Sequence, residues 1–316
     1  MKIIYAGSPD ASKITLEILY NNQAEYGFEI VGVLSNPDSA KGRHKELTPT
    51  PVAAFAMEKG LPVLKPEHLD AVAREEVQAL NPDLLVSFAY GHIFGPKFLG
   101  IFPMGGINLH PSLLPKYRGC TPVPAAIKNR DKQTAATVQT LALKMDEGDI
   151  VAQQIIDLDG TETGESLLNN SAEIGARLIL ELLKDASENG KLKQGVSQTG
   201  ESSYTNTLTK DDGRIDWTLS AAEIEAQIRA YNPNPGCWTM ENQLPLKIIA
   251  ASFIDDNKYS KEKPGTVVEF NKGQGIFIQT GKGILAVLEL QRQGKKNMKY
   301  KDFMNGARDF VGTILE

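Results

Sequence analysis

In Gly106-Ile107-Asn108-Leu109-His110-Pro111-Ser112-Leu113-Leu114-Pro115, a short and mostly apolar run leads to His110 and Pro111. The residues up to His110 predict a strand, and Pro111 ends it because proline has no backbone N–H to give to a sheet. Asn108 and His110 are two residues apart, so their side chains emerge on the same face of that strand. We therefore expect an amide and an imidazole side by side at the carboxyl end of a strand, where open α/β sheets bind ligands.

This pair of side chains has a chemistry that suits acyl transfer. An asparagine amide can donate to an oxygen that becomes negative, and histidine can donate or accept a proton near neutral pH. The alternative is a polar pair that only satisfies the end of a strand. Asn-x-His alone does not separate these two interpretations.

Outward from this strand, apolar runs alternate with segments of helical periodicity in the first 184 residues. Apolar strands separated by helices predict an α/β fold whose mostly parallel sheet is covered on both faces, and the last two strands are expected to pair antiparallel. The predicted strands are 3–6, 28–34, 61–64, 83–88, 106–110, 137–143 and 150–158, and the predicted helices are 11–20, 51–59, 71–80 and 165–184.

The rest of the chain has a different pattern. Residues 185–206 are polar and glycine-rich, which is typical of a linker. An amphipathic helix is predicted over 221–230, with Ser220 as its N-cap. Five short strands follow, which favour a small β-barrel, with an oligonucleotide-binding (OB) type of fold as one candidate. These strands are 238–241, 246–250, 266–269, 275–280 and 284–288.

Length and charge indicate which classes of function are expected. A chain of 316 residues with a net charge of −5 is long enough for two domains and is not a typical nucleic-acid binder. The charge is uneven, however: residues 1–206 carry −6 and residues 207–316 carry +1. In the second part, the cations from Arg292 to Lys301 have no acid between them. They form either a phosphate-binding patch or a solvated charged loop.

Several classes find no support in the sequence. No apolar run reaches the roughly 18 residues of a membrane span, and the N-terminus lacks a signal-peptide pattern. Cys120 and Cys237 offer neither a disulfide framework nor zinc spacing, so a reducing cytoplasm is expected. Dinucleotide-binding, Walker and nucleophile-elbow motifs are absent, and the four histidines do not pair as metal ligands. No metal or protein nucleophile is therefore expected.

The segment Asn108–Gly119 resembles the signature of the folate-dependent formyltransferases. Five further segments, in the same order along the chain, resemble the members of this family that act on initiator methionyl-tRNA: Asn36-Pro37-Asp38, Lys41-Gly42-Arg43, Leu47–Val52, Phe88–Gly91 and Arg214–Trp217. The resemblance implies a Rossmann-like formyltransferase domain at 1–184, a linker at 185–206 and an OB-like tRNA-binding domain at 207–316.

The activity implied is transfer of the formyl group of 10-formyltetrahydrofolate to the amino group of methionine on initiator methionyl-tRNA, for translation initiation. Folate is the co-substrate, no metal takes part and a monomer is expected. The resemblance assigns Asn108, His110 and Asp146 as catalytic, with Asp149 as a nearby competitor for the last role. Ala142 and Lys144 depart from the Asp and Gly that are usual in this loop, which predicts a differently shaped loop.

The same resemblance assigns two binding sites. Folate is expected against Ser112, Leu113, Leu114 and Pro115 on one wall and Phe88, Ala89, Tyr90 and Gly91 on the other, and the alternative is core packing. For tRNA, the expected residues are Lys41, Arg43 and Lys45 in one loop and Arg292, Lys295 and Lys296 in the C-terminal cluster. Cys120, where alanine is commoner, is interpreted as a buried small apolar residue.

Three rival functions remain open. The first two are formylation of an amino-sugar nucleotide and hydrolysis of formylfolate, which use the same Asn-x-His and Asp residues. The third is a non-catalytic tRNA-binding protein with a degenerate α/β domain.

Overall fold

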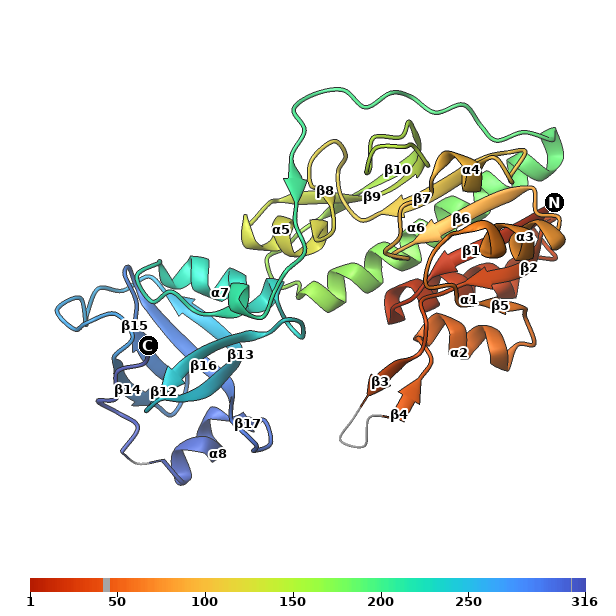
Figure 1. Cartoon of the computed structure of the whole chain (residues 1–316). Helices are drawn as coiled ribbons and strands as arrows, with labels where there is room; N and C mark the ends of the chain where they lie inside the picture. The colour runs from red at the N-terminus through yellow and green to blue at the C-terminus, as the bar shows by residue number, and fades with distance from the viewer. Residues whose placement is uncertain (42–45, 308) are drawn as a thin grey trace. The chain divides into compact units, whose positions relative to one another are not determined.

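The computed structural model describes residues 1–41, 46–307 and 309–316 (Figure 1). The chain forms two compact units. The first consists of Met1–Pro122, Gln133–Asp157 and Leu168–Thr205, and the second of Val123–Lys132, Leu158–Leu167 and Asn206–Glu316. Among the helices that the structure describes, none has the length and apolar character needed to cross a membrane.

The first unit is built on a seven-stranded sheet in the order β10-β9-β7-β6-β1-β2-β5. β9 pairs antiparallel with both β7 and β10, and every other pairing in the sheet is parallel. This confirms the predicted α/β, Rossmann-like fold. The strands are β1 (Lys2–Gly7), β2 (Glu29–Leu34), β5 (Val63–Leu64), β6 (Leu84–Phe88), β7 (Gly106–His110), β9 (Gln133–Thr140) and β10 (Ile150–Asp157).

Helices connect these strands, and side chains cap the start of two of them. Thr50 caps α2 by accepting from the Ala53 N–H, and Asp70 caps α3 by accepting from the Ala73 N–H. The helices are α1 (Asp10–Asn22), α2 (Pro51–Glu58), α3 (Ala71–Ala79), α4 (Pro96–Leu99), α5 (Pro122–Lys128) and α6 (Gly164–Asn189). The sequence patterns missed α4 and α5, which are short and begin at prolines, a residue that favours the first turn of a helix.

A column of aromatic rings packs under β1 and β6. Tyr90, Phe94, Phe98 and Phe102 follow one another with ring centroids 5.5, 5.5 and 5.8 Å apart. All four are buried in one apolar cluster with residues of both strands. The chain that leaves β6 is therefore anchored directly beside the carboxyl end of the sheet.

Three short pairings complete the first unit. β3 (Ser39–Lys41) forms a hairpin with β4 (Glu46–Thr48), and β8 (Arg118–Gly119) pairs with β11 (Tyr204–Thr205). Val196 pairs with Ile150 at the start of β10. The stretch expected as a linker thus begins inside α6, which continues to Asn189, and its later residues are hydrogen-bonded to the first unit (Figure 1).

The second unit contains α7 (Ala221–Ala230), which starts at the predicted cap: Ser220 and Glu223 form a reciprocal capping box. Its antiparallel sheet has the order β12-β13-β16-β15-β14, with β17 on β16. The strands are β12 (Cys237–Glu241), β13 (Leu244–Ile254), β14 (Val267–Asn271), β15 (Gly275–Gln279), β16 (Ile284–Arg292) and β17 (Met298–Lys299), followed by α8 (Tyr300–Asn305).

Residues 312–316 close this sheet into a barrel. On one side, Val267 N donates to Thr313 O at 2.8 Å and Leu315 N donates to Gly265 O at 2.9 Å, next to β14. On the other side, Met240 of β12 and Glu316 exchange N–H···O bonds of 2.8 and 3.1 Å. The last residues therefore lie between the two edge strands, and the predicted small β-barrel of OB-like type is confirmed.

Candidate active site

β7 places Asn108 and His110 on one face of the sheet, as its alternation requires. The strand register adds Gln139 opposite Asn108 and Thr137 opposite His110, both on β9. Directly opposite residues of an antiparallel pair share a face, so these four polar side chains lie together. Asp146 comes from the β9–β10 loop, and its Oδ1 lies 3.5 Å from His110 Nδ1. The imidazole and the distant carboxylate therefore do converge.

His110 is held from both ends of its ring. It is 4% exposed, and Nε2 lies 2.8 Å from the carbonyl oxygen of Tyr117. Because a carbonyl only accepts, Nε2 carries a hydrogen and donates it. Burial lowers the pKa of His110 below its ordinary value, although Asp146 and the Tyr117 carbonyl act in the opposite direction. The neutral ring then presents the lone pair of Nδ1 toward Asp146.

The carboxylate of Asp146 is oriented by two donors. Gly119 N donates to Oδ2 and Gln139 Nε2 donates to Oδ1, both at 2.8 Å. Asp146 has φ 55°, in the left-handed region that Asp tolerates better than most residues. The competitor Asp149 instead accepts from Ser197 Oγ at 2.9 Å. Of the two acids, Asp146 is the one directed at the imidazole.

The β9–β10 loop is tied at its base. Thr140 N donates to Asp149 O, and Asp149 N donates to Thr140 Oγ1, each at 2.9 Å. Gly148 passes so close that an added Cβ would lie 1.7 Å from Thr140 O. Lys144, one of the two departures noted in the sequence, is exposed and lies 3.7 Å from Glu147.

Sequence reasoning missed two glutamines that touch this loop. Gln139 is 1% exposed, and its position as a long polar side chain in a buried strand was the available signal. Gln198 lies in the expected linker, and its Nε2 donates to Asp146 O at 2.8 Å. No local pattern marks Gln198, because its partners come from segments 50 or more residues away.

The proposed folate wall after β6 is a turn with exposed backbone. Ala89 (φ 51°) and Gly91 (φ 88°) are both exposed and left-handed. Phe88 and Tyr90 are buried, so a ligand at this turn meets their backbone rather than their rings. Among the described residues, the Tyr90 hydroxyl and Asn36 Oδ1 are buried and have no hydrogen-bond partner. This turn therefore offers backbone amides and unpaired polar groups next to the aromatic cluster. Such a surface fits a flat and polar ring system.

The opposite segment has mixed exposure. Ser112 and Leu114 are buried, whereas Leu113 and Pro115 are half-buried. Ser112 Oγ donates to Lys116 O at 2.7 Å, and Thr137 Oγ1 donates to Ser112 O at 2.7 Å. Cys120 follows this segment and is exposed, so its interpretation as a buried apolar residue was wrong.

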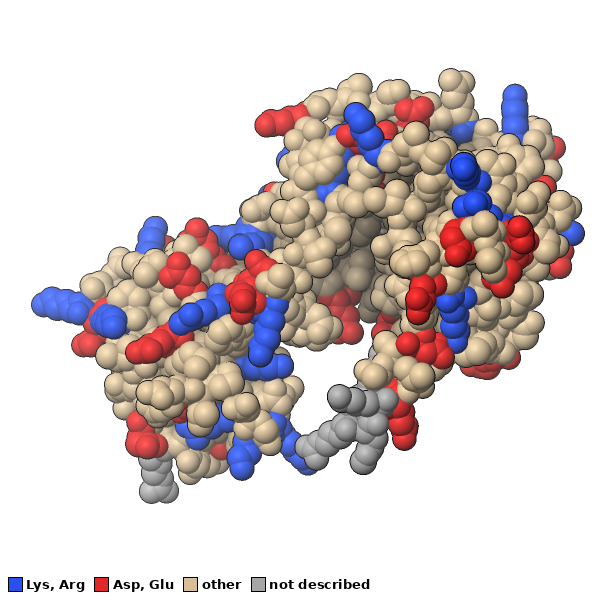
Figure 2. All heavy atoms as spheres, in the orientation of Figure 1, with Lys and Arg blue, Asp and Glu red and all other residues tan. Residues whose placement is uncertain are grey.

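The residues expected to bind tRNA are placed unequally. Lys41 ends β3, whereas Arg43 and Lys45 lie outside the described residues. Lys295 and Lys296 are exposed between β16 and β17. Arg292 differs from them: it forms an ion pair with Glu241 of β12 at 2.5 Å, and its guanidinium lies 4.6 Å from the centre of the Phe303 ring. On the face shown in Figure 2, Lys and Arg side chains of both units are interspersed with acids.

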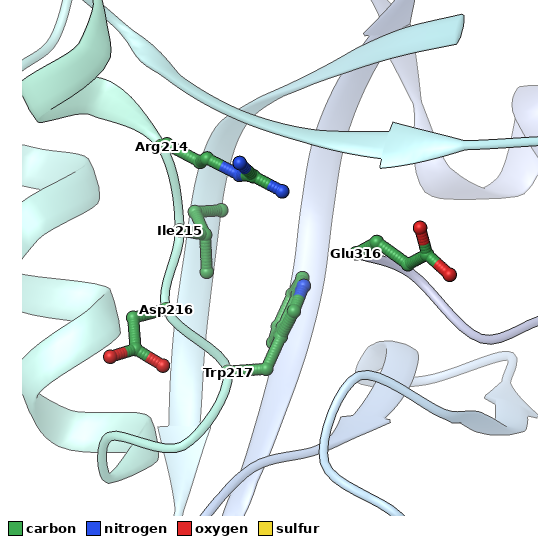
Figure 3. A pocket seen from close by; sticks show the side chains of 5 residues that line it. All are labelled: Arg214, Ile215, Asp216, Trp217 and Glu316. Carbon is green, nitrogen blue, oxygen red and sulfur yellow. The ribbon is translucent and has the colours of Figure 1, made fainter. Parts of the chain in front are cut away.

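Figure 3 shows a pocket of the second unit. It is lined by Arg214, Ile215, Asp216, Trp217 and Glu316. Trp217 Nε1 donates to Thr239 Oγ1 at 3.0 Å, so this tryptophan anchors the segment to β12. Within residues 1–41, 46–307 and 309–316, no three His, Cys, Asp or Glu side chains gather as metal ligands.

Comparison with known proteins supplies the family. Residues 1–183 match the formyl transferase family, and residues 207–308 match the formyl transferase C-terminal domain. A methionyl-tRNA formyltransferase of Treponema denticola is 45% identical, over 98% of this chain and 98% of that protein. The chain belongs to the methionyl-tRNA formyltransferase family. A second member of the family, from Borreliella burgdorferi (strain ZS7), is 39% identical over 100% of this chain and 99% of that protein.

Solved structures share the fold of this family. A methionyl-tRNA formyltransferase from Clostridium thermocellum has a TM-score of 0.58 at 18% identity, covering 80% of this chain and 93% of that one. HypX from Aquifex aeolicus in complex with tetrahydrofolic acid has a TM-score of 0.65 at 15% identity, covering 98% of this chain and 48% of that one. The chain is a formyltransferase, and 10-formyltetrahydrofolate is its formyl donor, as in the rest of its family.

Proposed function

We propose that this chain formylates the amino group of methionine on initiator methionyl-tRNA, and that Asn108, His110 and Asp146 carry the reaction. The observation that supports these roles is the fixed imidazole, with Nε2 bound to Tyr117 and Nδ1 turned toward Asp146. No protein nucleophile is needed, because the amine of the substrate attacks the formyl carbon.

His110 acts first as a base. The attacking amine, with a reference pKa near 8, must be unprotonated and must lose a proton as the C–N bond forms. Nδ1 of neutral His110 accepts that proton, directly or through one water. Asp146, fixed by Gly119 and Gln139, stabilises the imidazolium that results.

Asn108 and the newly protonated Nδ1 then act as donors. Charge develops on the formyl oxygen during attack, and both groups lie on the side of the sheet where they can donate to it. Proton return from Nδ1 to the leaving nitrogen of the folate restores neutral His110. Nδ1 carries both steps, because Nε2 is already committed to Tyr117.

We propose that folate lies between the turn Phe88–Gly91 and the segment Ser112–Pro115, where it supplies an activated formyl group. Backbone groups of Ala89 and Gly91 would bind its polar ring edges, and Leu113 and Pro115 would cover its faces. For tRNA we propose Lys41, Arg43, Lys45, Lys295 and Lys296 as phosphate contacts. Arg292 belongs to the same cluster but is largely occupied by Glu241.

We further propose a division into a catalytic part at 1–184, a connection at 185–206 and a tRNA-binding part at 207–316. The family matches at 1–183 and 207–308 support these limits. A monomer that works in the cytoplasm is proposed as well, because translation initiation takes place there. Size-exclusion chromatography with light scattering tests the monomer.

One assay tests the function. Purified protein is mixed with 10-formyltetrahydrofolate and charged initiator tRNA, and formylmethionine is measured after hydrolysis of the aminoacyl bond. Formate release without an amine acceptor would instead indicate a hydrolase. Formylation of an amino-sugar nucleotide in place of tRNA would indicate the other enzyme, and tRNA binding without turnover a non-catalytic protein.

A further inference from the structure

We propose that Gln198, which lies in residues 195–205, here called the strap, is a positioning residue for Asp146. This inference rests on the proposed roles of His110 and Asp146. The sequence pattern of the strap is that of a connection between domains. Its hydrogen bonds reach both turns that hold the His110–Asp146 pair.

Gln198 joins the catalytic loop to β8. Its Nε2 donates to Asp146 O and Gly148 O, each at 2.8 Å. Its Oε1 accepts from Nε and Nη2 of Arg118 at 3.1 and 2.8 Å. Nε2 also donates to Oε1 of Gln139 over a longer distance of 3.3 Å, so both ends of the amide are engaged in one orientation. The backbone on both sides of Glu147 is thereby fixed.

The strap also fixes the turn that holds the other end of the pair. Ser203 accepts from Tyr117 N through Oγ and from Arg118 N through its carbonyl oxygen, both at 2.9 Å. The Tyr117 carbonyl is the partner of His110 Nε2, and Gly119 N is a donor to Asp146. Gly119 approaches Thr205 so closely that an added Cβ would lie 2.3 Å from its carbonyl oxygen.

A second set of bonds joins Arg118, Glu147 and Tyr204 beside Gln198. Glu147 lies 3.2 Å from Arg118 Nη1 and accepts from the Tyr204 hydroxyl at 2.6 Å. Arg118 Nη1 also donates to that hydroxyl at 2.9 Å. Arg118 is therefore held in place to orient the Gln198 amide, while Glu147, the neighbour of Asp146, is held on the same side.

We expect the β9–β10 loop to change conformation when the hydrogen bonds of Gln198 are removed. Asp146 is left-handed at φ 55°, a conformation that the surroundings must enforce. A carboxylate that withdraws from Nδ1 no longer stabilises the imidazolium formed during attack. Misplacement of a reacting group by about 1 Å can cost roughly 100-fold in rate.

Two substitutions separate positioning from packing. Gln198→Ala removes all of these bonds, whereas Gln198→Glu keeps an acceptor for Arg118 and removes the donors to the loop and to Gln139. Ser197→Ala is the matched control, because it removes a neighbouring bond from the strap to Asp149. We expect kcat to fall about 10- to 100-fold in both Gln198 variants, with KM for either substrate changed by less than about threefold. Ser197→Ala should stay close to the parent.

A spectroscopic measurement tests the position of the charge. Asp146 is the charged group that faces His110, and its effect is to raise the imidazole pKa against burial. The pKa of His110, followed by NMR with a His110→Asn spectrum to assign its signal among the four histidines, should fall in Gln198→Ala. A substitution that only loosened the strap would leave this pKa unchanged.

The outcomes are distinct. Gln198 variants that keep kcat within about threefold of the parent, or an unchanged His110 pKa in a folded Gln198→Ala, would overturn the positioning role. Failure of the proposed function would show itself differently, as near-normal formylation by His110→Ala or Asp146→Asn. If Gln198→Ala does not fold, Gln198→Glu with a normal melting temperature carries the same test.

Discussion

The end of β7 and the turn between β16 and β17 both carry side chains singled out from the sequence, but they hold them in opposite ways. At β7, His110 is buried and bound at Nε2, and its carboxylate partner has two further donors. At the turn, Lys295 and Lys296 are exposed. Proton transfer needs fixed groups at short range, whereas attraction to phosphate acts at long range and tolerates mobile side chains. Substitutions should therefore change kcat at the first region and tRNA affinity at the second.

The largest effect is expected at the imidazole and its carboxylate. His110→Ala and Asp146→Asn should each lower kcat by roughly 10²–10⁴, the range for loss of a general acid or base. Steady-state formylation of methionyl-tRNA measures this. Asp149→Asn is the control, since Asp149 bonds to Ser197 rather than facing His110. Equal losses in the two Asp→Asn variants would remove the distinction drawn between these acids.

The next largest loss in kcat is expected at Asn108. Asn108→Ala removes a donor to the formyl oxygen, and a loss of about 10²–10³ in kcat is expected. Asn108→Asp has nearly the same size but presents a negative charge to a developing negative charge, so it should be at least as slow. Circular dichroism melts of both variants provide the folding control. Rapid turnover by Asn108→Asp would show that this side chain does not face the formyl oxygen.

Arg292 lies between these two cases, because it belongs to the basic cluster by sequence but is paired with Glu241 of the barrel. Arg292→Gln breaks its ion pair with Glu241, a residue 8% exposed, and leaves that carboxylate without its cation. We expect a loss of about 1–2 kcal/mol in the unfolding of the second unit, measured by urea titration. The free energy of tRNA binding should change by less than this amount. A variant with unchanged stability but much weaker tRNA binding would assign Arg292 to the tRNA contacts after all.

The smallest effects are expected at the exposed lysines. Lys295→Glu and Lys296→Glu should each raise KM for tRNA a few-fold and leave kcat unchanged, since each removes at most one cation that binds a phosphate. The slope of log affinity against log salt should become shallower by about one for each phosphate that the variant no longer neutralises. Lys261→Glu makes the same charge change at another exposed site of the second unit. An identical response there would mean that only net charge matters.

Local patterns predicted one half of the active site and not the other. Asn108 and His110 could be placed because alternation along a strand and a terminating proline are local signals. Asp146 was assigned only through the family resemblance, since nothing in its own loop points to a residue 36 positions earlier. Gln139 required the register of β7 with β9, and Gln198 required the fold of the whole first unit.

The same reasoning applies to the stretch expected as a linker and to Arg292. Residues 190–205 contain few apolar positions, so no periodicity reveals that they bind to β8 and β10 through side-chain amides, hydroxyls and backbone. Arg292 was grouped with its lysine neighbours by charge alone. Its partner Glu241 lies on β12, 51 residues away, and only the barrel brings the two together.

Closure of the barrel by residues 312–316 sets an order for biosynthesis. The sheet of the first unit has all its strands once residue 157 has been made, and the strap follows by residue 205. The second sheet keeps two open edges, at β12 and β14, until residues 312–316 have emerged from the ribosome. Open edges invite pairing with other chains, so the nascent second unit is exposed to misassembly until these residues have emerged.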